Sequence, residues 1–202
     1  SCLAAQLPAA VGGCWDVYRN LQTAVVGAFS QFMPNDLGGE NPGGVNHVYV
    51  AGYDTERNKP YILYEYPGGG SPASSDTDGA SGIMCYDHGD IPSVYPAESV
   101  EQRQPLLVEC LQMRNDGEGA GYKRSGFGVM RRIKILSDGS QLNVMTDRGV
   151  IPPWGSAQAP SGSHNSFTVL RDGKELEPSE IPGKVKSFPL KQGDVVLMQT
   201  TA

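Results

Sequence analysis

The feature that most constrains the fold of this chain is a series of short β-like segments, separated by tight turns, that begins near residue 103. The turns read SDGS (137–140), RDGK (171–174) and KQGD (191–194), and Asp-Gly and Gln-Gly pairs are typical of sharp chain reversals. The pattern therefore predicts antiparallel or mixed sheets in the C-terminal half. The expected strands are residues 106–113, 128–136, 141–146, 167–171, 184–190 and 194–200.

The first half of the chain begins with a different periodicity. Residues 14–33 place large apolar side chains three and four positions apart, which predicts an amphipathic helix that ends before Pro34. Residues 45–52 and 61–66 then form two apolar or alternating runs around DTERNKP, which predicts a β-hairpin. The expected fold class is α+β and predominantly β, with an N-terminal amphipathic helix followed by antiparallel or mixed sheets.

The length of 202 residues allows one large domain or two small ones. We divide the chain into residues 1–118, a helix and hairpin region that continues a missing N-terminal part, and residues 119–202, a β-rich region. The small and polar stretch 68–82, GGGSPASSDTDGASG, is either a linker or a ligand-ordered loop. Strand patterns flank it on both sides, which favours a loop within one structural unit.

Composition excludes some classes of function. The formal net charge is −6, whereas general nucleic-acid binding requires a basic face. No apolar run approaches the roughly 18 residues that a membrane-spanning helix needs. None of the four cysteines forms a C-x-x-C pair, so we expect buried free thiols in a reducing cytoplasm, with a disulfide or a metal site as the alternatives.

The stretch 119–132, GAGYKRSGFGVMRR, combines four glycines with four cations and could form a phosphate cradle or a structural corner. Gly121 and Gly126 have the spacing of a P-loop, but Phe127 occupies the position of its lysine. The residues that follow, VMRRIKIL, favour a strand rather than the helix that such a cradle needs. We therefore expect a corner, with glycines at bulges or at positive φ.

Two stretches contain candidate site residues. In YEYPGGG, Glu65 ends an apolar strand, and Gly68, Gly69 and Gly70 would let backbone amides approach a ligand closely. The alternative is an ordinary strand-end glutamate before a flexible turn. In CYDHGD (85–90), His88 lies among cysteine and aspartate residues, but the spacing matches no common metal site. His47, within an apolar strand, is more typical of a packed histidine.

Five segments occur in an order that resembles a known family. They are PAAVGG…TAVVGAF, YEYPGGG, GAGYKRSGFGVMRRIKIL, TDRGVIPPWG and LKQGDVVLMQT, and the most specific are residues 119–128 and 147–155. The series resembles the C-terminal part of the hydantoinase B/oxoprolinase family and covers nearly the whole chain. Family members have a histidine-rich stretch after the glycine turn, whereas this chain has IMCYDHGDIPS with only His88.

The resemblance implies a multisubunit, ATP-dependent enzyme. ATP with Mg, and a divalent metal (Mn or Zn), would be bound mainly by other chains: a hydantoinase A-like ATPase subunit and the missing N-terminal portion. The metal ligands of the family lie in that portion, so no metal ligand is assigned to this chain. Glu65, Gly68–Gly70 and His88 are the positions that we expect near the substrate.

The resemblance covers two reaction branches. The first expectation is a component of a carboxylase that acts on a ketone, as in acetone and acetophenone carboxylases. The alternatives are a subunit of a cyclic-amide hydrolase acting on hydantoin, oxoproline or lactam, and a non-catalytic structural module of such a complex. In all three cases the partners are protein subunits, the substrate is a small molecule, and no activity is expected from this chain alone.

Overall fold

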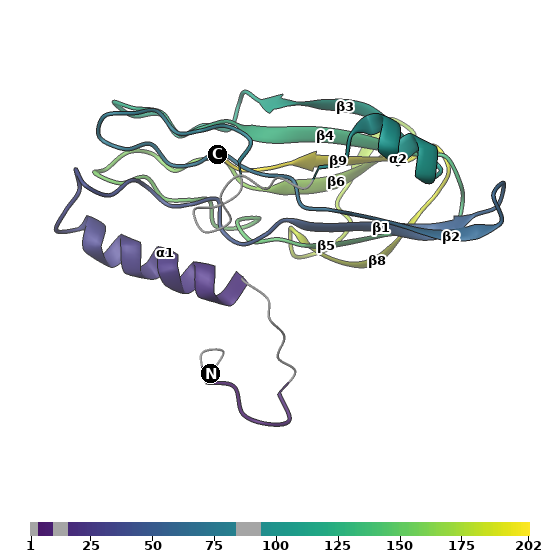
Figure 1. Cartoon of the computed structure of the whole chain (residues 1–202), viewed down its shortest axis with the longest axis horizontal. Coiled ribbons are helices and arrows are strands. Elements are labelled where there is room, and N and C mark those ends of the chain that lie inside the picture. Colours follow the sequence, from purple (N-terminus) through teal and green to yellow (C-terminus); the bar gives the residue numbers. More distant parts are fainter. Residues whose placement is uncertain (1–3, 10–15, 84–93) are drawn as a thin grey trace.

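The computed structural model describes residues 4–9, 16–83 and 94–202 and contains two antiparallel β-sheets packed face to face (Figure 1). The first sheet has the strand order β2-β1-β5-β8 and the second has the order β3-β4-β9-β6-β7. The strands of the first sheet are β1 (His47–Asp54), β2 (Lys59–Glu65), β5 (Ser140–Met145) and β8 (Lys184–Leu190). Those of the second are β3 (Leu106–Arg114), β4 (Gly128–Ile135), β6 (Ser166–Arg171), β7 (Lys174–Leu176) and β9 (Val195–Gln199).

This architecture confirms the predicted fold class and the six predicted C-terminal strands, each within two residues at either end. The predicted hairpin is β1 and β2, which pair from Val48↔Glu65 to Asp54↔Lys59. The sequence did not predict β7 or the helix α2 (Ala97–Arg103), both of which are short. Three residues of strand and one buried side chain, Val100, are too little for a periodic signal.

The two sheets share one hydrophobic core because alternate residues of each inner strand point inward. Neighbouring strands contribute such pairs as Val48 and Val50 from β1, and Ile133 and Ile135 from β4, all at most 2% exposed. α2 covers the edge of the core and adds Val100. A core of this kind fills the space between two sheets that pack about 10 Å apart.

Both sheets combine strands from the two sides of residue 118. In the first sheet, β1 pairs with β5 from His47↔Met145 to Ala51↔Gln141. In the second, β3 pairs with β4 along its whole length, with one irregularity between Val108 and Cys110. The two regions that the sequence suggested are therefore interleaved within one sandwich.

The turns have the backbone that their sequences require. Asp172 and Gly173 both have positive φ, 52° and 74°, which is the arrangement of a tight β6–β7 hairpin. Gly139 and Gly193, in the other two predicted turns, also have positive φ. The irregular stretch 68–82 is a loop that returns to the sandwich, since Gly69 forms an isolated bridge with Ile83.

The predicted helix is α1 (Asp16–Ser30), which ends before Pro34 as expected and lies outside the sandwich (Figure 1). Among the described residues, no helix is long and apolar enough to cross a bilayer. Of the four cysteines, only Cys110 belongs to the described part of the chain. Its thiol is free and half-buried.

Candidate functional site

A cavity of about 540 Å³ lies at one end of the sandwich, where four loops meet. They come from residues 34–40 after α1, 72–75, 119–125 and 153–162. Two of these loops belong to the segments that the sequence analysis found most specific, residues 119–128 and 147–155. Convergence of these separate segments on one hollow makes it the candidate site, since ligand sites are usually concave and shared between loops.

Glu40 and Trp154 form one wall of the cavity. The backbone N–H of Glu40 donates to the carbonyl of Trp154 at 2.8 Å, and the N–H of Trp154 donates to Glu40 Oε2 at 3.1 Å. The other oxygen, Oε1, accepts a hydrogen bond from Arg148. Glu40 is 6% exposed, and burial raises the pKa of its carboxyl above 4.5 against the opposing effect of Arg148 and the Trp154 N–H.

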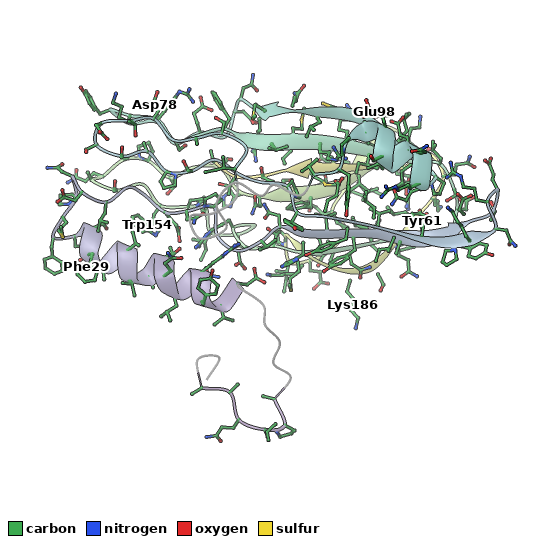
Figure 2. All side chains as sticks on the ribbon, in the orientation of Figure 1. Phe29, Tyr61, Asp78, Glu98, Trp154 and Lys186 are labelled. Carbon is green, nitrogen blue, oxygen red and sulfur yellow. The ribbon has the colours of Figure 1, made fainter. Side chains whose placement is uncertain are left out.

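Trp154 also connects the cavity wall to α1. A Cβ at Gly27 would lie 3.0 Å from the indole atom Cζ2, which is a tight contact, so the glycine lets the helix approach the ring closely. Figure 2 shows Trp154 between α1 and the loops of the cavity. A displacement of α1 would therefore move a cavity-lining side chain.

The stretch 119–125 lines another part of the cavity, and the structure shows that it is a corner. The N–H of Gly79 donates to the carbonyl of Arg124 and the N–H of Gly126 donates to that of Ser71, which ties the stretch to the 68–82 loop. β4 follows, as predicted. Of the two alternatives expected for the glycines, bulges or positive φ, the second does not occur, because none between 119 and 128 has positive φ. They are needed for close approach: a Cβ at Gly126 would overlap the carbonyl oxygen of Ala80.

Glu65, predicted near the substrate, lies in the core between the sheets. Its Oε1 accepts hydrogen bonds from Arg131 Nη2 at 2.8 Å and from the Tyr95 N–H at 3.1 Å, and both charged side chains are fully buried. Burial raises the pKa of Glu65 above 4.5, and the charge of Arg131 opposes this. Glu65 is not among the residues that line the cavity. Its predicted catalytic role stays a prediction, and the contacts found are structural.

Gly68, Gly69 and Gly70 approach other backbone closely. Gly69 exchanges two 2.8 Å hydrogen bonds with Ile83, and the N–H of Gly70 donates to the carbonyl of Thr201 at 3.0 Å. A Cβ at Gly70 would overlap the carbonyl of Gly126. The absence of side chains at these positions thus brings the 68–82 loop against the C-terminal strand region, and none of the three lines the cavity.

Of the two histidines discussed in the sequence, the structure describes His47 but not His88. His88 and the CYDHGD stretch lie outside the described residues. His47 is half-buried, and its Nδ1 lies 2.6 Å from the hydroxyl of Tyr64, while Nε2 lies 3.6 Å from Asp16. The expectation of a packed histidine with a satisfied ring nitrogen is confirmed.

The described residues do not fit the cofactors that the resemblance implies. No group of three or more His, Cys, Asp or Glu side chains in residues 4–9, 16–83 and 94–202 could hold a metal ion. The charged side chains lining the cavity are Glu40 and Lys123, whereas a triphosphate requires several converging cations or amides. We therefore assign neither group to the described part of this chain.

The residues that build the cavity wall were not among the site residues predicted from the sequence. Arg148 and Trp154 were quoted only as part of TDRGVIPPWG, and Glu40 lies in NDLGGENPGG, which has the composition of an ordinary loop. The signal available in the sequence was the pair of segments most specific to the family resemblance, residues 119–128 and 147–155, because both contribute to the cavity.

Comparison with known proteins shows to which family the chain belongs. The sequence model of hydantoinase B/oxoprolinase matches residues 1–202. The chain is 29% identical to an uncharacterised protein of Methanocaldococcus jannaschii over 96% of this chain and 32% of that protein. It is 24% identical to a protein of Pseudomonas sp. that is named for a D-/L-hydantoinase, over 84% of this chain and 27% of that protein. The chain thus spans less than a third of the length of either of these relatives.

Two solved structures share the fold. An ATP-dependent caprolactamase from Pseudomonas jessenii has a TM-score of 0.75 at 19% identity and covers 98% of this chain and 35% of its own. A nucleotide-free acetone carboxylase, from a study of ATP-dependent acetone carboxylation, has a TM-score of 0.62 at 17% identity over 80% of this chain and 26% of its own. With the family match over its whole length, this chain belongs to the hydantoinase B/oxoprolinase family.

Proposed function

We propose that this chain is part of a subunit of an ATP-dependent enzyme that opens a cyclic amide. The observation that carries the proposal is the family match over residues 1–202, together with relatives whose names refer to hydantoin and caprolactam, both of which contain an amide within a ring. An amide is an unreactive carbonyl, so coupling its hydrolysis to ATP supplies the driving force.

This proposal reverses the order of the two branches expected from the sequence. The preference for ketone carboxylation rested on general likeness of the sequence. The caprolactamase fold matches 98% of this chain with a TM-score of 0.75, whereas the acetone carboxylase fold matches 80% with a TM-score of 0.62. Carboxylation of a ketone stays as the second candidate, supported by that second structure.

Within such an enzyme, the described residues would supply walls rather than reacting groups. Both oxygens of Glu40 already accept hydrogen bonds, from Arg148 and from the Trp154 N–H, which holds the carboxylate in place. The loops around the cavity are rich in glycine, alanine, serine and proline, whose short side chains leave room for another surface. Metal and nucleotide chemistry would come from residues other than those described here, and the chain by itself would be inactive.

The test is substrate-dependent ATP turnover by the native assembly, purified through a tag on this chain. We expect ADP release to rise with a hydantoin, 5-oxoproline or a lactam, together with the ring-opened amino acid detected by mass spectrometry. Acetone or acetophenone with bicarbonate serves as the comparison. Carboxylated product with no ring opening would replace the first candidate by the second. ATP turnover that is indifferent to both substrate classes would contradict both.

A further inference from the structure

α1 is attached to the sandwich with its apolar face turned outward. An amphipathic helix of a globular protein normally turns its apolar stripe toward the core. Here six large apolar side chains on one side of the helix and in the turn after it are between 42% and 82% exposed. They are Val17, Tyr18, Leu21, Val25, Phe29 and Phe32, and at about 100° per residue they fall within one continuous arc.

The opposite side of α1 explains this orientation. Most side chains turned toward the sandwich are small or polar: Arg19 is buried, while Thr23, Gly27 and Ser30 are half-buried, and Val26 is the one large apolar residue beside them. Gly27 rests against the indole of Trp154. Figure 2 shows Phe29 pointing away from the body of the molecule. The mainly polar face of α1 thus packs against the sandwich, and the apolar face is exposed.

A segment near α1 also exposes apolar side chains. Asn20 of α1 donates to Asp147 Oδ2 at 2.9 Å and accepts from Arg148 at 3.2 Å, which places the 147–151 segment beside the helix. That segment exposes Val150 and Ile151, at 63% and 70%. A contiguous apolar face such as that of α1 marks an interaction site more often than a solvated face.

The charge pattern argues against a bilayer as the partner. Helices that lie on membranes carry Lys and Arg on their polar face. α1 contains one cation, Arg19, which is buried against the sandwich, and one acid, Asp16. An uncharged apolar face fits a protein surface that is itself apolar.

The lengths of the relatives indicate which protein that is. The 193 aligned residues make up 32% of the Methanocaldococcus jannaschii relative, so that protein has about 600 residues. These relatives therefore have roughly two thirds or more of their chains beyond the part that matches here, which is a large protein surface available to cover the apolar face of α1. We propose that the outward face of α1 (Val17, Tyr18, Leu21, Val25, Phe29 and Phe32) is the docking surface for that remaining two thirds of a hydantoinase B polypeptide.

Docking at this face would place the remaining part beside the cavity. Residues 34–40 follow α1 directly and line the cavity, and Trp154 contacts both. Residues that the described part of this chain does not supply would then reach the cavity from the docked part. The inference depends on family membership and on the geometry of α1, so it can hold even if the proposed reaction is wrong.

The experiment compares two substitutions in the same helix. Val25→Glu places a charge in the outward apolar face, and Gln22→Glu places the same charge at an exposed position beside it. The chain is titrated by calorimetry with the polypeptide of the same source that carries the remaining part of the family fold. If both parts belong to one polypeptide, backbone hydrogen exchange of α1 is measured in that polypeptide instead. We expect roughly 100-fold weaker binding, or loss of α1 protection, for Val25→Glu and no change for Gln22→Glu.

Other outcomes would overturn the proposal. Equal binding by wild type and Val25→Glu would exclude this face. A dimer of wild-type chain that Val25→Glu dissociates would make the partner a second copy. Binding to phosphatidylcholine or phosphatidylglycerol vesicles that Val25→Glu abolishes would make it a membrane. Circular dichroism checks folding of each variant, and Phe29→Ser replaces Val25→Glu if that variant does not fold.

Discussion

At the scale of residues, the ion pair between Glu65 and Arg131 joins the end of β2 in one sheet to β4 in the other. Both side chains are fully buried, and the pair is bracketed by the backbone N–H and C=O of Tyr95. Among the described residues, Glu65 Oε2 and the Arg131 atoms Nε and Nη1 have no hydrogen-bond partner. A buried pair with unused hydrogen-bonding capacity is costly to break because removing one member isolates the other charge.

We therefore predict that Glu65→Ala lowers the free energy of unfolding by about 3–5 kcal/mol. The double variant Glu65→Leu/Arg131→Met should recover much of that loss, because it removes both charges and keeps the volume. Urea denaturation of the two variants measures this. If Glu65→Ala is as stable as wild type while the assembly loses activity, the catalytic role predicted from the sequence would be the correct one.

Asp194 gives a prediction for pH. Burial raises the pKa of its carboxyl, but hydrogen bonds from Arg171 at 2.6 and 2.8 Å, a further bond from the Lys191 N–H and the charge of Arg171 outweigh burial, so the pKa lies below 3.8. A carboxyl with a depressed pKa stabilises the fold above its unfolded pKa, and this contribution is lost as the pH falls through the folded pKa.

Accordingly, Asp194→Asn should lower the free energy of unfolding by about 1.5–3 kcal/mol at pH 7. The difference from wild type should shrink as the pH falls below 3.8 and through the lower pKa of the folded state, since the carboxyl then becomes protonated in both states of the wild type. Denaturation curves at several pH values provide the measurement, with the exposed Glu180→Gln as the control. A difference that is constant with pH would mean that the charge of Asp194 contributes nothing.

At the scale of elements, the corner 119–128 and the loop 68–82 hold each other through backbone contacts. Gly126 and Gly70 are each so close to a carbonyl of the other segment that neither tolerates a Cβ. Gly119 lies in the same corner, but its nearest neighbour would be 3.4 Å from a Cβ, which is ordinary contact. The three glycines look alike in the sequence and differ only in what lies opposite them.

This difference predicts that Gly126→Ala destabilises the chain by about 2 kcal/mol or more, whereas Gly119→Ala has little effect. Thermal unfolding followed by circular dichroism is sufficient to compare the two. Equal stability of both variants would show that the 68–82 loop moves away freely from the corner.

The same elements show how far sequence reasoning reaches. The strands were predictable because alternation and Asp-Gly turns are local signals, and α1 because its apolar residues recur with the helical period. The outward orientation of α1 was not predictable, since periodicity identifies an apolar face without saying what covers it. The wall formed by Glu40, Arg148 and Trp154 depends on contacts more than 100 residues apart in the chain, and no local pattern encodes those.

At the scale of the whole molecule, neither half of the chain can complete a sheet. β5 lies between β1 and β8, and β4 lies between β3 and β9, so the boundary at residue 118 separates hydrogen-bonded neighbours. Cutting there would leave Leu142 and Ile133, both 0% exposed in the intact chain, without the strand beside them.

We predict that residues 1–118 and residues 119–202, expressed separately, both lack the dispersed amide spectrum of a folded protein, and that mixing them restores it. Two-dimensional nuclear magnetic resonance spectra of each fragment, of the mixture and of the intact chain provide the comparison. Cooperative unfolding by residues 119–202 alone would show that this region has a sufficient core of its own.

The interleaving of distant strands also has a kinetic consequence. β4 pairs with β9 from Met130↔Gln199 to Lys134↔Val195, and β1 pairs with β5 almost a hundred residues further along. Loops of this size must close before their contacts can form, and chains dominated by distant pairings fold slowly, over milliseconds to seconds. During synthesis on the ribosome, β1 and its neighbour β2 would emerge well before β5, which pairs with the other edge of β1, and would expose apolar faces that a chaperone could recognise.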